Sequence, residues 1–139
     1  MAGPRVVLAE DHATMARDLK ALLSREFMVD VVSDGQQLID AVEESLPDVI
    51  VSDISMPGMS GLASARTILT KHPDARIIFV TVRDEPAVIA AALSEGALGY
   101  VVKCDAGDEL EQAVRWALRG ARYISATAIA ALARLEGQE

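Results

Sequence analysis

Five polar residues that can take part in phosphate and metal chemistry end or follow short apolar runs in this 139-residue chain. They are Glu10, Asp11, Asp53, Thr81 and Lys103. If the three carboxylates lie within about 4–6 Å of one another, they repel by a few kcal/mol at an effective dielectric constant of about 20. One of them would then keep a proton unless a cation were bound. A hard divalent ion such as Mg²⁺ removes this penalty, because it binds one or two carboxylates, several waters and phosphate oxygens.

Asp53 has the position expected of a nucleophile. It follows the apolar run 49–52 and precedes a loop that contains Pro and Gly. A carboxylate in such a site can attack phosphorus and form an aspartyl phosphate. Phosphoryl transfer depends mainly on positioning and charge neutralisation, which a metal ion and the Lys103 ammonium would supply, with a hydrogen bond from the Thr81 hydroxyl. Each residue alone has an ordinary explanation, such as a helix N-terminus or a turn. Their joint occurrence after strands favours the site.

Apolar residues occur in two alternating patterns along the chain. Short runs rich in β-branched residues predict strands, and the segments between them, with apolar residues three or four apart, predict helices. The predicted strands are 6–9, 28–32, 49–52, 77–82 and 100–102. The alternation is typical of an α/β fold, a doubly wound five-stranded parallel sheet in the order 2-1-3-4-5 flanked by five helices, with both faces of the strands covered.

This strand order gathers the polar residues at one edge of the sheet. In such folds, ligands bind outside the carboxyl ends of the strands, at the switch point between strands 1 and 3. Glu10 and Asp11 follow the first strand and Asp53 follows the third. The second strand is followed only by an ordinary Ser33-Asp34-Gly35 turn. The chemically useful residues therefore occur where the fold can use them.

The composition restricts the class of protein. A net charge of −8, from 13 basic and 21 acidic residues, provides no basic surface for nucleic acid or an anionic membrane. Cys104 is the single cysteine, so no internal disulfide can form and a reducing compartment is expected. The apolar stretches reach only about six or seven residues, against the roughly 18 that a membrane span requires. Residues 1–5 lead directly into the first predicted strand and do not have the pattern of a signal peptide. We expect a cytoplasmic domain with no membrane partner.

The chain continues beyond the five-stranded unit. Gly120 is followed by Tyr123-Ile124-Ser125 and by an alanine-rich segment, 126–135, whose apolar spacing predicts a short extra C-terminal helix capped by Ser125. We therefore predict a domain at residues 1–120 and a C-terminal extension or linker helix at 121–139.

Four segments carry a resemblance to a known family. They are V-L-A-E-D, V-I-V-S-D-I-S-M-P-G-M-S-G, F-V-T-V and G-A-L-G-Y-V-V-K. Over about residues 5–120, the chain resembles the receiver domains of two-component response regulators, which implies a flavodoxin-like, CheY-like fold. The resemblance implies that Asp53 accepts a phosphoryl group from a histidine kinase, with Mg²⁺ (or Mn²⁺) held by Glu10, Asp11, Asp53 and the backbone carbonyl of Ser55. Thr81 and Lys103 would contact the phosphoryl group.

The same resemblance implies how the domain would act. Thr81 and Tyr100 would form a switch pair, although an aromatic residue on the last strand could also simply pack at the sheet edge. The wording E-G-A-L-G-Y-V-V-K, with G-A-R-Y-I-S further on, resembles receivers that precede LuxR-type helix-turn-helix output domains (NarL/FixJ-like). Such a protein would bind DNA only through an output domain that this chain does not contain. Homodimerisation is a hypothesis, and the domain is expected to be no enzyme beyond slow self-dephosphorylation.

Some residues depart from the family's usual pattern. Val82 follows Thr81 where many receivers carry a smaller residue, so its bulk could restrict access to the phosphoryl group. Cys104 follows Lys103 where many receivers have Pro, so the frequent cis bond is not assured there. Ser55 occupies a position that tunes dephosphorylation in the family. His12, beside the acidic pair, is expected to be an exposed loop residue rather than a ligand.

Other functions remain as alternatives. The chain could be a stand-alone single-domain regulator that acts through protein–protein contacts. A phosphatase with the same Asp nucleophile needs a second Asp two residues later as general acid, and this chain has Ser55 there. A flavodoxin-like cofactor binder would need an anion-binding first loop, whereas Glu10 and Asp11 would repel a flavin phosphate. A degenerate receiver, which acts only as an interaction domain, is the last alternative. The complete set of acidic residues in this chain argues against it.

Overall fold

Within residues 3–136, six parallel strands form one sheet in the order β2-β1-β3-β4-β5-β6. The computed structural model describes residues 3–136. The strands are β1 Arg5–Ala9, β2 Met28–Val32, β3 Val49–Ser52, β4 Ile77–Thr81, β5 Gly99–Val102 and β6 Tyr123–Ile124. The chain runs from β1 outward to β2 and then returns to β3 on the other side of β1, and each neighbouring pair is parallel. The predicted switch point between β1 and β3 is therefore present.

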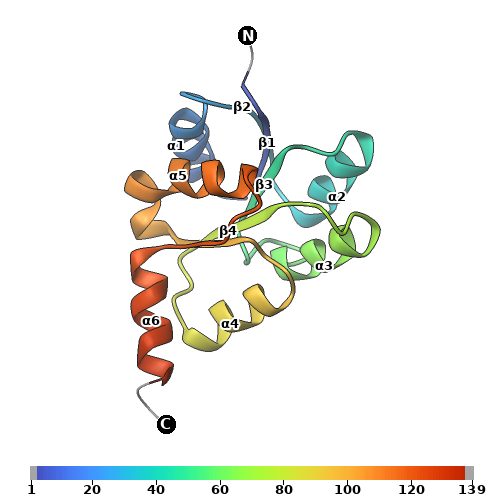
Figure 1. Ribbon diagram of the computed structural model, residues 1–139. Helices are drawn as coiled ribbons and strands as arrows, with labels where there is room; N and C mark the ends of the chain where they lie inside the picture. Colours follow the sequence, from blue (N-terminus) through green and yellow to red (C-terminus); the bar gives the residue numbers. More distant parts are fainter. Residues whose placement is uncertain (1–2, 137–139) are drawn as a thin grey trace.

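In the described part of the chain, six helices and one 3₁₀ turn connect and cover these strands. They are α1 Ala13–Leu23, α2 Gly35–Glu44, α3 Gly61–Lys71, α4 Pro86–Ser94, α5 Ala106–Leu118, α6 Ala126–Glu136 and the turn η1 Lys103–Asp105. Figure 1 shows α1 and α5 on one side of the sheet and α2 and α3 on the other. Side chains alternate between the faces of each strand, so Val6 and Leu8 pack under α1 and α5, whereas Val7 and Ala9 face the second core. Every buried Val, Leu or Ile in these cores contributes about 1.5–3 kcal/mol.

The edge strand β2 differs from the other strands. Met28 and Val31 are 50% and 39% exposed, and no residue of β2 is fully buried. The prediction that both faces of the strands are covered is wrong here. An edge strand has a neighbour on one side only, so the flanking helices that cover the middle of the sheet do not enclose it.

A sixth strand extends the predicted five-stranded order. Tyr123 and Ile124 pair with Gly99 and Tyr100 of β5. Two residues are too few to show an alternating pattern, which is why the sequence predicted five strands. The predicted C-terminal helix is present as α6, and its Ala128 and Ala131 are fully buried in the same core as Ile89 of α4.

Two further expectations concern single residues. Ser125 directly precedes α6. Its Oγ accepts a hydrogen bond from the Val102 amide at 3.1 Å, so the hydroxyl is bonded to the end of β5. The described peptide bonds are all trans, including the bond between Lys103 and Cys104. Among residues 3–136, no helix combines the length and apolar character needed to cross a bilayer.

A chain that ends at Gly120 is expected to fold but to be less stable. Truncation uncovers the edge of β5 and removes Ala128, Ala131 and the partly buried Ile124 from the core. We expect the free energy of unfolding to fall by ~3 kcal/mol, because several apolar side chains lose their burial. Urea unfolding measures this difference, with a chain ending at Glu136 as the control. Equal stability of the two chains would contradict the packing role of β6 and α6.

Candidate functional site

The carboxyl ends of β1, β3 and β5 bring three charged side chains into contact. Lys103 Nζ lies 2.7 Å from Glu10 Oε1 and 2.9 Å from Asp53 Oδ2. The pairing of β1 with β3 sets Ala9 beside Ser52, and the Asp53 amide donates to the Ala9 carbonyl at 3.0 Å. The three side chains are at most 8% exposed. Residues far apart in sequence therefore meet at the switch point, as the strand order predicted.

Charge within this cluster is only partly balanced. Burial alone would lower the pKa of Lys103, but hydrogen bonds and charge attraction from Asp53 and Glu10 outweigh it, so the pKa is raised. Lys103 is therefore cationic at neutral pH. One ammonium faces two carboxylates, and Asp11 adds a third acidic group beside them. The site favours a further cation.

The acidic side of the site has free oxygen atoms that a metal ion could use. Ligand atoms of Glu10, Asp11 and His12 lie within 4.8 Å of one another. Asp11 Oδ1 is shielded from solvent and has no hydrogen-bond partner among the described residues. Glu10 Oε1 is paired with the Lys103 ammonium at 2.7 Å. A shielded carboxylate oxygen without a partner, such as Asp11 Oδ1, is costly, and hard oxygen ligands suit Mg²⁺ or Mn²⁺. The residues present therefore fit such an ion.

His12 is as exposed as expected, with 76% of its side chain accessible. Its Nδ1 nevertheless lies 3.6 Å from Glu10 Oε2 and 3.7 Å from Asp11 Oδ1, and its backbone amide donates to Glu10 Oε2 at 3.1 Å. The amide contact fixes the second oxygen of Glu10. A backbone contact of this kind has no signature in the sequence.

The two oxygens of Asp53 have different neighbours. Oδ2 accepts from Lys103 Nζ, and Oδ1 accepts from the Ser55 amide at 3.3 Å. The contact of Ser55 with the site is thus made by its N–H, and the role predicted for its carbonyl oxygen stays a prediction. This arrangement holds the Asp53 carboxylate in one orientation.

Thr81 and Tyr100 are joined through the backbone of one residue. Thr81 is fully buried at the end of β4, and its Oγ1 accepts from the Arg83 amide at 3.2 Å. Tyr100 is also fully buried, and its hydroxyl donates to the Arg83 carbonyl at 2.8 Å. Burial, followed by the charge of Glu85, raises the pKa of Tyr100 well above its ordinary value. Because β6 lies beyond β5, Tyr100 does not lie at an open edge of the sheet. It packs inside the domain.

A depression lies next to this cluster. Its volume is about 330 Å³, and its lining residues are His12, Thr14, Met15, Asp18, Val82 and Lys103. Val82 is 69% exposed there, so its side chain stands at the approach to Lys103. The depression offers space for a molecule that reaches the site from solvent.

Gly61 fixes the loop that carries Asp53. A Cβ atom on Gly61 would lie 1.9 Å from the Asp53 carbonyl oxygen, and the Gly61 amide donates to the Ile54 carbonyl at 2.7 Å. Only glycine allows α3 to begin this close to the backbone of Asp53.

Gly61→Ala is therefore expected to lower the free energy of unfolding by ~1–3 kcal/mol, since the helix or the loop must move. Urea unfolding tests this. Gly107→Ala is the matched control, because Gly107 lies in α5 and, apart from its chain neighbours and the backbone of its own helix, nothing described lies within 4 Å of the added Cβ, and alanine favours helices. Equal effects of the two substitutions would argue against the close contact.

Comparisons with known proteins agree on one family. Residues 6–115 match the response regulator receiver domain. The transcriptional regulatory protein DegU of Brevibacillus brevis is 31% identical over 123 residues, which cover 86% of this chain and 52% of that protein. Response regulator GacA of Pseudomonas viridiflava is 34% identical over 124 residues, which cover 87% of this chain and 58% of that protein. The chain thus spans somewhat more than half the length of these relatives.

Solved structures extend the similarity to nearly the whole chain. A two-component response regulator of the LuxR family from Aurantimonas sp. SI85-9A1 superposes with a TM-score of 0.92 at 28% identity, covering 98% of this chain and 99% of that one. The isolated REC domain of RcsB from Salmonella enterica serovar Typhimurium, in the presence of phosphomimetic BeF3-, gives a TM-score of 0.83 at 26% identity, covering 94% and 99%.

Proposed function

Because the chain belongs to the family of response regulator receiver domains of two-component systems, we propose that Asp53 is its phosphoacceptor. One observation carries the proposal: the buried Asp53 carboxylate is held between Lys103 and the Ser55 amide, and Lys103 also pairs with Glu10. The proposed donor is the phosphohistidine of a sensor histidine kinase, since receiver domains of this family interact with such kinases.

The proposed transfer uses groups that are already in position. An oxygen of Asp53 attacks phosphorus and forms an O–P bond, while the P–N bond to the donor imidazole breaks and its electron pair stays on that nitrogen. Lys103 is close enough to pair with the phosphoryl oxygens, and its raised pKa keeps it charged. The Thr81 hydroxyl can donate to another phosphoryl oxygen when it turns from the Arg83 amide.

Receiver domains of this family use Mg²⁺ for phosphorylation. In this chain, Glu10, Asp11, Asp53 and the Ser55 carbonyl would hold the ion, which would neutralise negative charge on the transferred group. Asp11 Oδ1 supports this assignment, because it is shielded from solvent and has no hydrogen-bond partner within residues 3–136.

The domain is proposed to act as a switch and not as a turnover enzyme. Thr81 and Tyr100 share Arg83 as a partner, so movement of the Thr81 hydroxyl toward a phosphoryl group would disturb the contacts of Tyr100. Such a change shifts a two-state equilibrium that exists before phosphorylation. Self-dephosphorylation is proposed to be slow.

The proposed setting is a cytoplasmic transcription factor whose output domain binds DNA. DegU, one of the relatives that this chain matches, is a transcriptional regulatory protein, and a solved structure of RcsB contains two dimers bound to two parallel DNAs. A homodimer is proposed for this chain by the same analogy.

Intact-mass measurement with acetyl phosphate tests the proposed function. We expect the protein to gain the mass of one phosphoryl group in the presence of Mg²⁺ and none in EDTA. Hydroxylamine should remove the added group, because an acyl phosphate reacts with it and a phosphoserine does not. Labelling that is independent of Mg²⁺, or resistant to hydroxylamine, would count against the proposal.

A further inference from the structure

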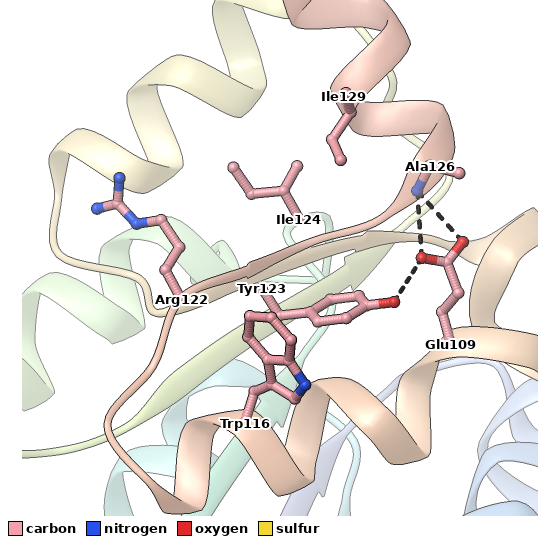
Figure 2. Close-up of a pocket in the computed structure, with 7 residues that line it drawn as sticks. All are labelled: Glu109, Trp116, Arg122, Tyr123, Ile124, Ala126 and Ile129. Carbon is pink, nitrogen blue, oxygen red and sulfur yellow. Dashed lines mark hydrogen bonds between the residues drawn. The ribbon is translucent and has the colours of Figure 1, made fainter.

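The N-terminus of α6 is bonded to the segment 100–109, which also contains Lys103. The Ser125 amide donates to the Tyr100 carbonyl at 2.9 Å, and Ser125 Oγ accepts from the Val102 amide at 3.1 Å. Asp105 binds Thr127 twice, accepting from its amide at 2.9 Å and from its hydroxyl at 3.0 Å. Figure 2 shows a further contact, in which the Glu109 carboxylate accepts from the Ala126 amide at 3.2 Å and from the Tyr123 hydroxyl at 2.7 Å.

These contacts supply what the start of a helix requires. The first amides of a helix have no partner within the helix, and its N-terminus carries partial positive charge, so carboxylates stabilise it. Asp105 and Glu109 act in this way on α6. Burial alone would raise the pKa of Asp105, but its hydrogen bonds from Ser125 and Thr127 lower it, so the carboxylate is charged at neutral pH. We call Asp105 and Glu109 with their bonds to residues 126 and 127 the α6 clamp.

One path connects the clamp to the phosphoacceptor through a single turn of chain. Lys103 and Asp105 are the two ends of η1. The Lys103 ammonium is paired with Asp53 and Glu10, while the Asp105 carboxylate is bonded to Thr127. If the Lys103 ammonium moves and η1 moves with it, Asp105 moves too. The bond from Asp105 to Thr127 then transmits the movement to the start of α6.

A second path runs through the proposed switch pair. Thr81 Oγ1 accepts from the Arg83 amide, the Arg83 carbonyl accepts from the Tyr100 hydroxyl, and the Tyr100 carbonyl accepts from the Ser125 amide. Each of these three hydrogen bonds is 3.2 Å long or shorter. Both paths end on the residues that anchor α6.

We propose that phosphorylation of Asp53 and attachment of the α6 N-terminus are coupled, so that a phosphoryl group at Asp53 loosens the α6 clamp. The proposal rests on the proposed function, because it takes Asp53 as the phosphoacceptor. The ammonium of Lys103 moves from the Asp53 carboxylate to the phosphoryl oxygens, and the Thr81 hydroxyl turns away from the Arg83 amide. Both movements disturb bonds that hold α6 in the unphosphorylated domain. α6 is the last described element, so a change there reaches whatever chain follows it.

Coupling of two sites is reciprocal. If a bound phosphoryl group loosens the clamp, weakening the clamp must raise the affinity for a phosphoryl analogue by the same factor. Beryllofluoride with Mg²⁺ is the probe, and fluorine NMR of the bound fluoroberyllate measures its affinity without reference to α6.

Trp116 provides the second readout. It is the only tryptophan in the chain, and its ring packs edge-on against Tyr123, with the centroids 5.4 Å apart. It lines a groove of about 430 Å³ together with Ile129 of α6 (Figure 2). Movement of β6 or α6 therefore changes Trp116 fluorescence, and amide hydrogen exchange of residues 126–132 reports the helix directly.

The experiment compares the wild type with Asp105→Ala, Thr127→Val and Asp108→Asn. Asp105→Ala removes half of the clamp. Thr127→Val removes only the hydroxyl contacts of Thr127, with Asp105 at 3.0 Å and with Cys104 Sγ at 3.4 Å, and it covers the case that the first variant does not fold. Asp108 lies on α5 between the two clamp residues and makes no hydrogen bond to the described side chains and backbone of α6, so it controls for lost charge.

We expect beryllofluoride to speed exchange of the α6 amides in the wild type and to change Trp116 fluorescence. Asp105→Ala should raise the affinity for beryllofluoride about fivefold or more, the lower end of typical allosteric coupling, and Thr127→Val should raise it less. Asp108→Asn should leave it unchanged. Beryllofluoride that binds while α6 exchange stays the same or slows overturns the coupling alone. Failure of beryllofluoride to bind at all overturns the proposed function, and the coupling with it.

Discussion

Asp53→Asn is expected to abolish phosphoryl incorporation from acetyl phosphate. The amide is nearly the same size as the carboxylate, and its oxygen can still accept from Lys103 or the Ser55 amide, so the fold should persist. The amide lacks the negative charge and nucleophilicity that the O–P bond requires. Intact-mass measurement at saturating Mg²⁺ should show no added phosphoryl group. Asp74→Asn, at an exposed position distant in sequence from the site, is the control and should label like the wild type.

The stability of Asp53→Asn provides an independent check. Lys103 keeps Glu10 as its partner, so no buried charge is left alone. We expect the free energy of unfolding without Mg²⁺ to change by no more than about 1 kcal/mol. A phosphoryl group that persists in this variant would mean that another residue is the acceptor.

Lys103→Met is expected to have the largest effect on stability. The substitution keeps the apolar stem and removes the ammonium, which leaves Asp53 and Glu10 buried and without a cation. Loss of one partner from a buried charge cluster costs about 3–5 kcal/mol. Labelling should also slow by about 10²–10³-fold, as when a donor to a developing negative charge is removed. Urea unfolding and the rate of mass gain measure the two effects, and exposed Lys20→Met is the control.

The dependence of stability on Mg²⁺ and on pH distinguishes loss of the Lys103 charge from a loss of packing. In Lys103→Met, added Mg²⁺ should restore much of the lost stability, because an ion that binds only the folded state stabilises it. In the wild type, the pKa of Lys103 is raised above its ordinary value of 10.5, so its contribution is complete at neutral pH and is lost as the pH rises through the raised value. The variant should lack this alkaline step. A deficit that Mg²⁺ leaves unchanged would indicate damaged packing.

The sequence was sufficient to predict the core of the site. Glu10, Asp53 and Lys103 each follow a strand that is apolar enough to be recognised, and parallel strands end at the same edge of a sheet. Once the strand order was inferred, contact among these residues followed from topology, without knowledge of any side-chain conformation. The predicted C-terminal helix was found for a similar reason, since its apolar spacing is regular.

Other features depended on contacts that leave no local pattern. The strand β6 has two residues, and its pairing with β5 comes from the position of the chain after α5. Burial of Tyr100 depends on that pairing, and exposure of Met28 and Val31 depends on the place of β2 at the sheet edge. The sequence alone could assign none of these three.

The chemistry that could be predicted belongs to single residues at strand ends, because charge and hydrogen-bonding capacity are properties of the residue type and the strand carries it to a known edge. What only the tertiary structure decided is which partner each group has. Asp105 and Glu109 look like ordinary acidic residues at the start of α5, yet they bind amides about 20 residues later at the start of α6. Such pairings result from the packing of whole elements, which fixes distances that no sequence spacing encodes.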